Sequence, residues 1–306
     1  MGTFAKHSFE PIYHQPLPGG YFQRLAPLRY RTPDFTRGLL PETIRELRRR
    51  TGRRQLKILD LACGYGINSA LIRFGVDFAT FARQYPAPFP GPERPADLPD
   101  LTDPVHPAER PVLPTEPGTA SGSHAAPGPD FTRRAVARDA AFLRARRPTD
   151  TELTIVGLDL SRPATDYALA TGLLDAAVTT DLERQDPTEA DRAALTGADL
   201  VLATGAFSQV GPATLDRILA LQERPPVVLG WPLYGQPTDA LAGCLAAHGL
   251  ALSRPDPGPR HQRWFTDARE REAYHYSLRR LRLPFIGSTA ERSVCVTSLL
   301  GLPAWA

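Results

Sequence analysis

The sequence has few of the residues that cross-link a protein or anchor it in a membrane. Only three of its 306 residues are cysteine (Cys63, Cys244 and Cys295), and none lies in a C-x-x-C pair. This excludes a disulfide framework and favours a reducing compartment. No apolar run approaches the roughly 20 residues that span a bilayer, and the first residues lack the pattern of a signal peptide. We therefore expect a cytoplasmic protein without a membrane partner.

Lysine is also scarce, whereas arginine is abundant. Of the 36 basic residues, only Lys6 and Lys57 are lysine, which leaves 34 arginines. The formal net charge is only +3, so electrostatics give no reason to expect a nucleic-acid partner. Arg, Ala, Pro and Gly all have GC-rich codons, so we attribute this bias first to genome composition. Recognition of anionic substrates is the alternative.

Apolar runs alternate with helical patterns along most of the chain. The predicted strands are 56–62, 153–158, 176–180, 199–203 and 226–231, with two late strands near Ala251 or Arg263 and at 293–299. The predicted helices are 41–50, 67–74, 131–146, 162–172, 188–196, 212–222, 238–248 and 266–281. Such alternation predicts an α/β fold with a mostly parallel sheet and helices on both faces. The two late strands and the helix between them would supply an antiparallel edge strand.

The composition divides the chain into two parts and an insertion. Residues 1–52 are rich in aromatic residues and proline and end in the helix 41–50, with Pro41 in its first turn and Gly52 as its stop. We interpret them as a lid segment in front of an α/β domain at 53–306. Within that domain, 13 of the 44 residues from 86 to 129 are proline. Such a segment buries too little apolar surface to offset its ordering entropy, so we expect a mobile surface insertion.

The first motif follows the first predicted strand. The segment from Ile58 to Gly66 reads ILDLACGYG and leads into a predicted helix. The strand would deliver Asp60 to the carboxyl edge of the sheet, where ligands bind in open α/β folds. Gly64 and Gly66 would let the backbone approach a ligand closely. A dinucleotide fingerprint needs a third glycine where Ser69 stands, so NAD is disfavoured.

Three further strand ends carry matching features. Asp159 and Leu160 follow the strand at 153–158, and Asp181 and Leu182 follow the short strand at 176–180. Thr204 follows the predicted strand 199–203, within the segment DLVLATGAF. The insertion lengthens the interval between the first two acids to 99 positions, which is tolerable because the cost of closing a loop grows slowly with its length.

These motifs, in this order, resemble those of the class I methyltransferase superfamily, whose members bind S-adenosylmethionine (SAM) in a Rossmann-like fold. The aromatic N-terminal segment and the turn from Gly64 to Asn68 are similar to those of small-molecule enzymes of bacterial specialised metabolism. The resemblance implies a seven-stranded sheet and a site for SAM or S-adenosylhomocysteine. Asp60 would lie near the ammonium group, Asp159 would bind the ribose hydroxyls, and Asp181 would meet the adenine. The implied cofactor residues are Asp60, Ala62, Gly64, Gly66, Asn68, Asp159, Leu160, Asp181, Leu182 and Thr204. Ala62 departs from the pattern, because many members have glycine there.

Methyl transfer depends chiefly on alignment and exclusion of water, so no obvious general base is required. The candidates for a direct role are Tyr13, His14, Tyr21, Tyr30, Gln209, Trp231 and Tyr234. For the aromatic candidates, ordinary packing is the alternative. No cluster of His, Cys, Asp and Glu has metal-ligand spacing, which predicts no metal.

The sequence therefore favours a methyltransferase that modifies oxygen or nitrogen of a small molecule in bacterial natural-product biosynthesis. Two alternatives stay open. The same fold could align an intramolecular ring closure, in which an amine expels an anionic leaving group. The chain could also be a non-catalytic partner subunit that uses its Pro-rich segment for recognition. Association with itself or with a pathway partner is open as well.

Overall fold

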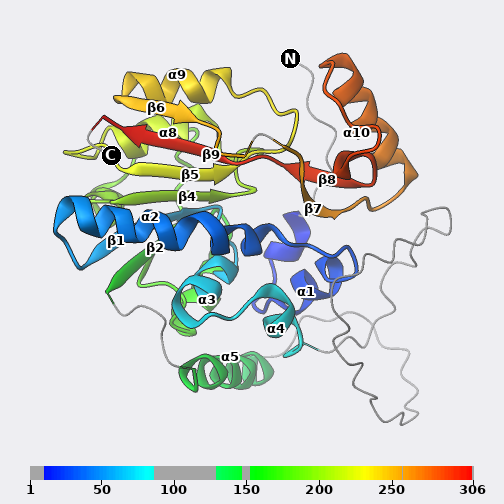
Figure 1. Cartoon of the computed structure of the whole chain (residues 1–306). Helices are drawn as coiled ribbons and strands as arrows, with labels where there is room; N and C mark the ends of the chain where they lie inside the picture. The colour runs from blue at the N-terminus through cyan, green and yellow to red at the C-terminus, as the bar shows by residue number, and fades with distance from the viewer. Residues whose placement is uncertain (1–9, 86–128, 147–151, 257, 305–306) are drawn as a thin grey trace, which may run out of the picture.

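The computed structural model describes residues 10–85, 129–146, 152–256 and 258–304 (Figure 1). The predicted insertion lies outside the described residues except for Pro129, with which α5 begins. None of the described helices combines the length and the apolar character needed to cross a membrane.

A seven-stranded sheet forms the centre of the molecule. Its strands are β1 (Leu56–Leu61), β2 (Leu153–Leu158), β3 (Ala176–Val178), β4 (Leu200–Thr204), β5 (Val227–Trp231), β6 (Leu250–Ser253) and β9 (Leu299–Pro303). They lie in the order β3-β2-β1-β4-β5-β9-β6, and β9 is antiparallel to both of its neighbours. The antiparallel strand is thus one place inside the edge that β6 forms. This is an α/β methyltransferase-like fold, as predicted.

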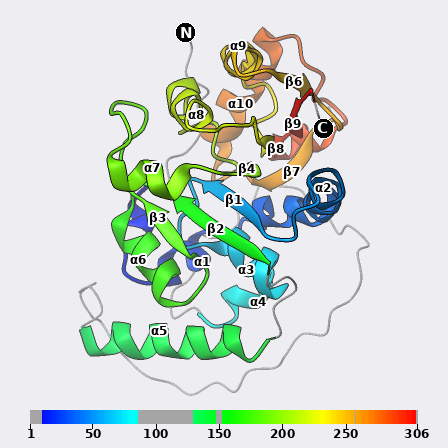
Figure 2. The ribbon, with the colours of Figure 1, turned by 90° about the vertical axis from the view of Figure 1, so that its left-hand side faces the viewer.

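Helices cover both faces of the sheet. One core lies between the sheet and α2 (Thr36–Thr51), α3 (Ile67–Phe74), α4 (Phe78–Ala82), α5 (Pro129–Arg144) and α6 (Arg162–Ala170). A second core lies between the sheet and α7 (Glu189–Leu195), α8 (Pro212–Leu219) and α9 (Asp239–Ala247). Figure 2 shows α5 on the outside of the first layer. Strands β1 and β4 are buried on both faces, which explains why their sequences are mostly apolar rather than alternating.

Two segments from opposite ends of the chain lie together beyond the carboxyl ends of β4 and β5 (Figure 1). The first contains η1 (Glu10–Tyr13), α1 (Gly19–Leu25) and η2 (Thr32–Phe35), and the second contains β7 (Arg260–Trp264), α10 (Ala268–Arg280), η3 (Thr289–Glu291) and β8 (Ser293–Val296). Backbone hydrogen bonds join them, from Arg31 N to Gln262 O at 2.9 Å and from Trp264 N to Leu28 O at 2.8 Å. We call residues 10–35 and 260–296 the cap.

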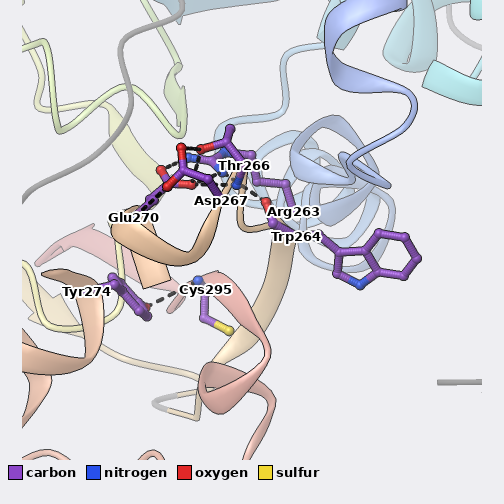
Figure 3. A network of polar contacts seen from close by, with 7 residues as sticks. All are labelled: Arg263, Trp264, Thr266, Asp267, Glu270, Tyr274 and Cys295. Carbon is purple, nitrogen blue, oxygen red and sulfur yellow. Dashed lines mark hydrogen bonds and ion pairs between the residues drawn. The ribbon is translucent and has the colours of Figure 1, made fainter. Parts of the chain in front are cut away.

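A buried ion pair stabilises the second half of the cap (Figure 3). Arg263 and Glu270 have side-chain exposures of 1% and 5%, and both terminal guanidinium nitrogens donate to the carboxylate. Thr266 adds its N–H and its hydroxyl to the same carboxylate, at 2.8 and 3.0 Å. Asp267 caps α10 by accepting from Glu270 N. This network joins β7 to the first turn of α10.

The predicted boundaries need three corrections. Helix α2 begins at Thr36, so Pro41 lies inside it rather than in its first turn. The reason is that η2 leads directly into α2, and Phe35 already has helical backbone angles. One strand was predicted near either Ala251 or Arg263, but both residues lie in strands, Ala251 in β6 and Arg263 in β7. The predicted strand 293–299 is divided between β8, in a separate two-stranded sheet with β7, and β9.

Candidate functional site

The turn after β1 has an unusual backbone. Ala62, Gly64 and Gly66 have φ values of +51°, +51° and +73°. Only glycine adopts this region without a penalty, which is roughly 1–2 kcal/mol for other residues. Ala62, the residue that departs from the family pattern, therefore holds a conformation that glycine would favour. The strain suggests that the shape of this turn is closely defined by its surroundings.

Asp60 lies at the end of β1 and is completely buried. The Asn68 amide donates to its Oδ1 at 3.0 Å and also to the hydroxyl oxygen of Thr204. Burial raises the pKa of Asp60 to about 7, although the Asn68 hydrogen bond opposes the rise. These three predicted residues thus connect the ends of β1 and β4 to the start of α3. A cation placed beside Asp60 would favour its ionised form.

Asp159 occupies the end of β2 and faces the turn. Its Oδ2 accepts from Gly64 N and its Oδ1 accepts from Ser161 N, both at 2.8 Å. Because a carboxylate oxygen has two lone pairs, each oxygen retains capacity for one more donor. Burial raises the pKa of this carboxyl above its ordinary value. The arrangement suits a ligand that presents two neighbouring hydroxyl groups.

The N-terminal segment lies directly on the turn. The Tyr65 hydroxyl lies 2.8 Å from the carbonyl oxygens of both Ile12 and Gln15, which share its single proton. Ser161 donates its hydroxyl to the carbonyl of Tyr13. The Tyr13 ring lies so close to Gly64 that a Cβ there would be 2.9 Å from its Cε1. These hydrogen bonds hold the N-terminal segment against the glycine-rich turn. The sequence had predicted a ligand at this place.

The two glycines of the turn serve different neighbours. Gly64 admits the ring of Tyr13, whereas a Cβ on Gly66 would meet the Cβ atoms of Ala168 and Leu173 at 3.1 Å. Gly66 therefore allows α6 and the following loop to pack against the start of α3. The sequence had indicated close approach of a ligand at both positions.

The second acidic loop is only partly buried. Asp181 has a side-chain exposure of 22% and pairs with Arg184 at 3.3 Å. Leu182 buries its side chain in the second core and donates its N–H to the carbonyl of Thr180. Leu160, by contrast, is 63% exposed. Since β3 lies beside β2, these residues share one edge of the sheet with Asp159.

The structure brings three of the predicted tyrosines together. The ring of Tyr21 lies 5.5 Å from that of Tyr13 and 6.3 Å from that of Tyr30, measured between centroids. Burial raises the pKa of each hydroxyl, and for Tyr13 and Tyr21 it rises well above the ordinary value. Their hydroxyls are therefore protonated at neutral pH, and they suit hydrogen-bond donation better than proton abstraction.

The other candidates are not part of this group of rings. His14 is exposed but close enough to Asp159 to lower the pKa of that carboxyl. Gln209 is exposed on the loop after β4. Trp231 is fully buried and stacks on Phe35. Tyr234 donates its hydroxyl to Pro284 O, so it is bound to the second half of the cap.

Sequence reasoning missed Tyr65, Ser161 and Gln262. None of the three was among the predicted site residues, and Ser161 is also the N-cap of α6. Gln262 is buried in β7, and its Nε2 would lie 3.2 Å from a Cβ on Gly205. The signal for Tyr65 was present, because a large aromatic residue inside a tight glycine-rich turn needs a partner to pack against.

No family model matches the sequence, and no curated protein matches it. Solved structures with a similar fold include a TehB-like SAM-dependent methyltransferase from Corynebacterium glutamicum, with 13% identity, 84% of this chain and 86% of that chain covered, and a TM-score of 0.35. The plantazolicin methyltransferase BpumL in complex with SAH has 11% identity, coverages of 89% and 85%, and a TM-score of 0.35. The 4+2 cyclase SpnF has 11% identity, coverages of 85% and 79%, and a TM-score of 0.33. At these values the likeness bears on neither activity nor substrate, and the fold follows from the strand order itself.

Proposed function

We propose that the chain binds S-adenosylmethionine at the carboxyl ends of β1 and β2 and methylates a small molecule under the cap. The observation that carries this proposal is the Asp159 carboxylate, which uses one lone pair of each oxygen for Gly64 N and Ser161 N. The remaining lone pairs match the two hydroxyls of a ribose.

The rest of the site fits the same ligand. Asp60 is buried at the end of the neighbouring strand and can balance the charge of an ammonium group. Asp181 lies beyond Asp159 along the same edge, where its carboxylate can accept from an amino group. When bound, S-adenosylmethionine supplies an electrophilic methyl group. The chain itself binds, orients and shields the reactants.

The end of β5 and the neighbouring cap strand β7 also provide polar groups for an acceptor. Among the described residues, Trp231 Nε1 and Gln262 Oε1 are buried and have no hydrogen-bond partner. One is a donor and the other an acceptor, and buried polar groups are costly unless they are paired. Trp231 ends β5 beside Thr204, and Gln262 lies against Gly205. This pair supports a neutral, polar acceptor such as a hydroxyl or amine compound.

Transfer itself can be tested with methyl-labelled S-adenosylmethionine and a panel of hydroxylated and amino acceptors. The proposal predicts label in an acceptor and equimolar S-adenosylhomocysteine. Conversion of an acceptor without consumption of S-adenosylmethionine would contradict methyl transfer and favour ring closure. A Gln262→Leu variant should lose turnover while it still binds S-adenosylhomocysteine. Gln55→Leu, at an exposed position immediately before β1, should retain both turnover and binding.

A further inference from the structure

Three potential metal ligands meet between helices α8 and α9, which cover the second core. Asp216 lies on α8, Cys244 lies on α9, and His248 is the C-cap residue that directly follows α9. One ligand atom from each lies within 4.8 Å of the other two. We propose that Asp216, Cys244 and His248 form a binding site for a transition-metal ion of the zinc type.

The local geometry favours a common ligand. Cys244 and His248 are four positions apart, so they share one face of α9. His248 Nε2 lies 2.7 Å from Asp216 Oδ1, and Cys244 Sγ reaches the Pro212 carbonyl in the first turn of α8 at 3.6 Å. Tetrahedral zinc with its usual bond lengths separates neighbouring ligand atoms by about 3.3–3.7 Å. Binding an ion would move the histidine and the aspartate apart by about half an ångström, and the sulfur, which lies within 4.8 Å of both, would take the same spacing.

The donor set selects the kind of ion. A thiolate is a soft ligand and an imidazole a borderline one, and together with one carboxylate they suit zinc rather than calcium or magnesium. Asp216 has a side-chain exposure of 62% and His248 one of 21%. The ion would thus be reachable from solvent, and water could take the fourth position. Its effect would be to join the helices that follow β4 and β5.

A reactive cysteine triad is a less suitable explanation of the same residues. Burial and the charge of Asp216 raise the pKa of the Cys244 thiol to about 11, whereas a nucleophilic cysteine needs its thiolate at neutral pH. A bound metal ion takes the thiolate as its ligand and displaces the proton. The third ligand is 28 positions from Cys244 in the sequence, which is why spacing alone had indicated no metal.

The test uses the full chain without an affinity tag, stripped with a chelator and titrated with cobalt(II) and then with zinc(II). We expect one ion per chain and a thiolate-to-cobalt absorption band that zinc removes. The band should disappear in Cys244→Ser, and His248→Gln should weaken zinc binding by about tenfold or more. Asp239→Asn, an exposed acid on the same helix, should leave the affinity unchanged.

A second measurement avoids dependence on the variants. In the wild-type chain, Cys63 and Cys295 are buried and Cys244 is the most accessible thiol, so zinc should slow its reaction with a thiol reagent. The absence of saturable cobalt binding would overturn the proposal, as would a thiolate band that survives Cys244→Ser. Zinc that leaves the thiol reaction unchanged would overturn it as well.

Discussion

The ring of Tyr13 packs against Gly64, a residue 51 positions later, so closely that a Cβ at that glycine would lie 2.9 Å from Cε1 and 3.2 Å from Cδ1. Hydrogen bonds from Tyr65 and Ser161 hold the same segment in place. The N-terminal part of the cap therefore packs directly against the glycine-rich turn. A ligand bound at Asp159 would have the Tyr13 side chain as a wall.

Gly64→Ala should destabilise the protein more than backbone strain alone explains. Its φ of +51° costs an alanine roughly 1–2 kcal/mol, and the contact with Tyr13 should add about 1–3 kcal/mol as overpacking. Denaturant unfolding would measure both. Gly172→Ala is the matched control, because its φ is +77° and a Cβ there meets nothing within 4 Å.

Repeating the Gly64→Ala substitution in a Tyr13→Ala background separates the cost of backbone strain from the cost of the contact with the Tyr13 ring. If the contact is responsible, Gly64→Ala in this background should cost no more than Gly172→Ala does. An equal cost of Gly64→Ala with and without the Tyr13 ring would show that the contact is not energetically important.

Asp60 should make stability depend on pH. Its pKa is about 7 in the folded chain and about 3.9 when unfolded, so the folded state holds the proton more tightly. This contribution is complete below about pH 4 and is lost as the pH rises through 7. Relative to Asp60→Asn, the wild type should lose at most about 1.4 kcal/mol per pH unit in this interval. Parallel stability profiles of the two proteins between pH 5 and 8 would contradict the prediction.

Glu270→Gln should strongly destabilise the cap. It would leave the buried Arg263 guanidinium without its carboxylate, and breaking a buried pair in this way costs about 3–5 kcal/mol. Urea unfolding checks the value. Asp130→Asn breaks an exposed pair with Arg133, whose side chains are 73% and 79% exposed, and should change stability by less than about 1 kcal/mol. A similar small effect of both variants would refute the assigned importance of the buried pair.

The sheet was largely predictable because its strands carry local signals. Residues 56–61 and 153–158 are predominantly apolar runs, and the structure has strands at both places. Helix α1 was not predicted, because its sequence begins with two glycines after a proline. Packing of Tyr21, Phe22 and Leu25 in the core, rather than intrinsic propensity, defines it. The contact of Tyr13 with Gly64 had no local signal at all.

The cap illustrates the same limit at larger scale. Its halves are more than 200 positions apart, and their register depends on backbone hydrogen bonds such as that from Arg31 N to Gln262 O. Backbone pairing of this kind leaves no side-chain pattern in either segment. The acidic residues at strand ends were predictable, because the carboxyl ends of parallel strands meet at one edge. The sequence could not predict which carboxylate lone pairs would accept hydrogen bonds from the backbone.

The central claim is an adenosyl-cofactor site at Asp159, and calorimetric titration of the ligand-free chain with S-adenosylmethionine and S-adenosylhomocysteine tests it most directly. Both should bind at one site. Asp159→Ala should weaken binding by about 1–3 kcal/mol, as expected for lost charged hydrogen bonds. Asp166→Asn, on the exposed side of α6, should leave it unchanged. Failure of the folded wild-type chain to bind either compound, or unaltered binding by a folded Asp159→Ala variant, would contradict the account.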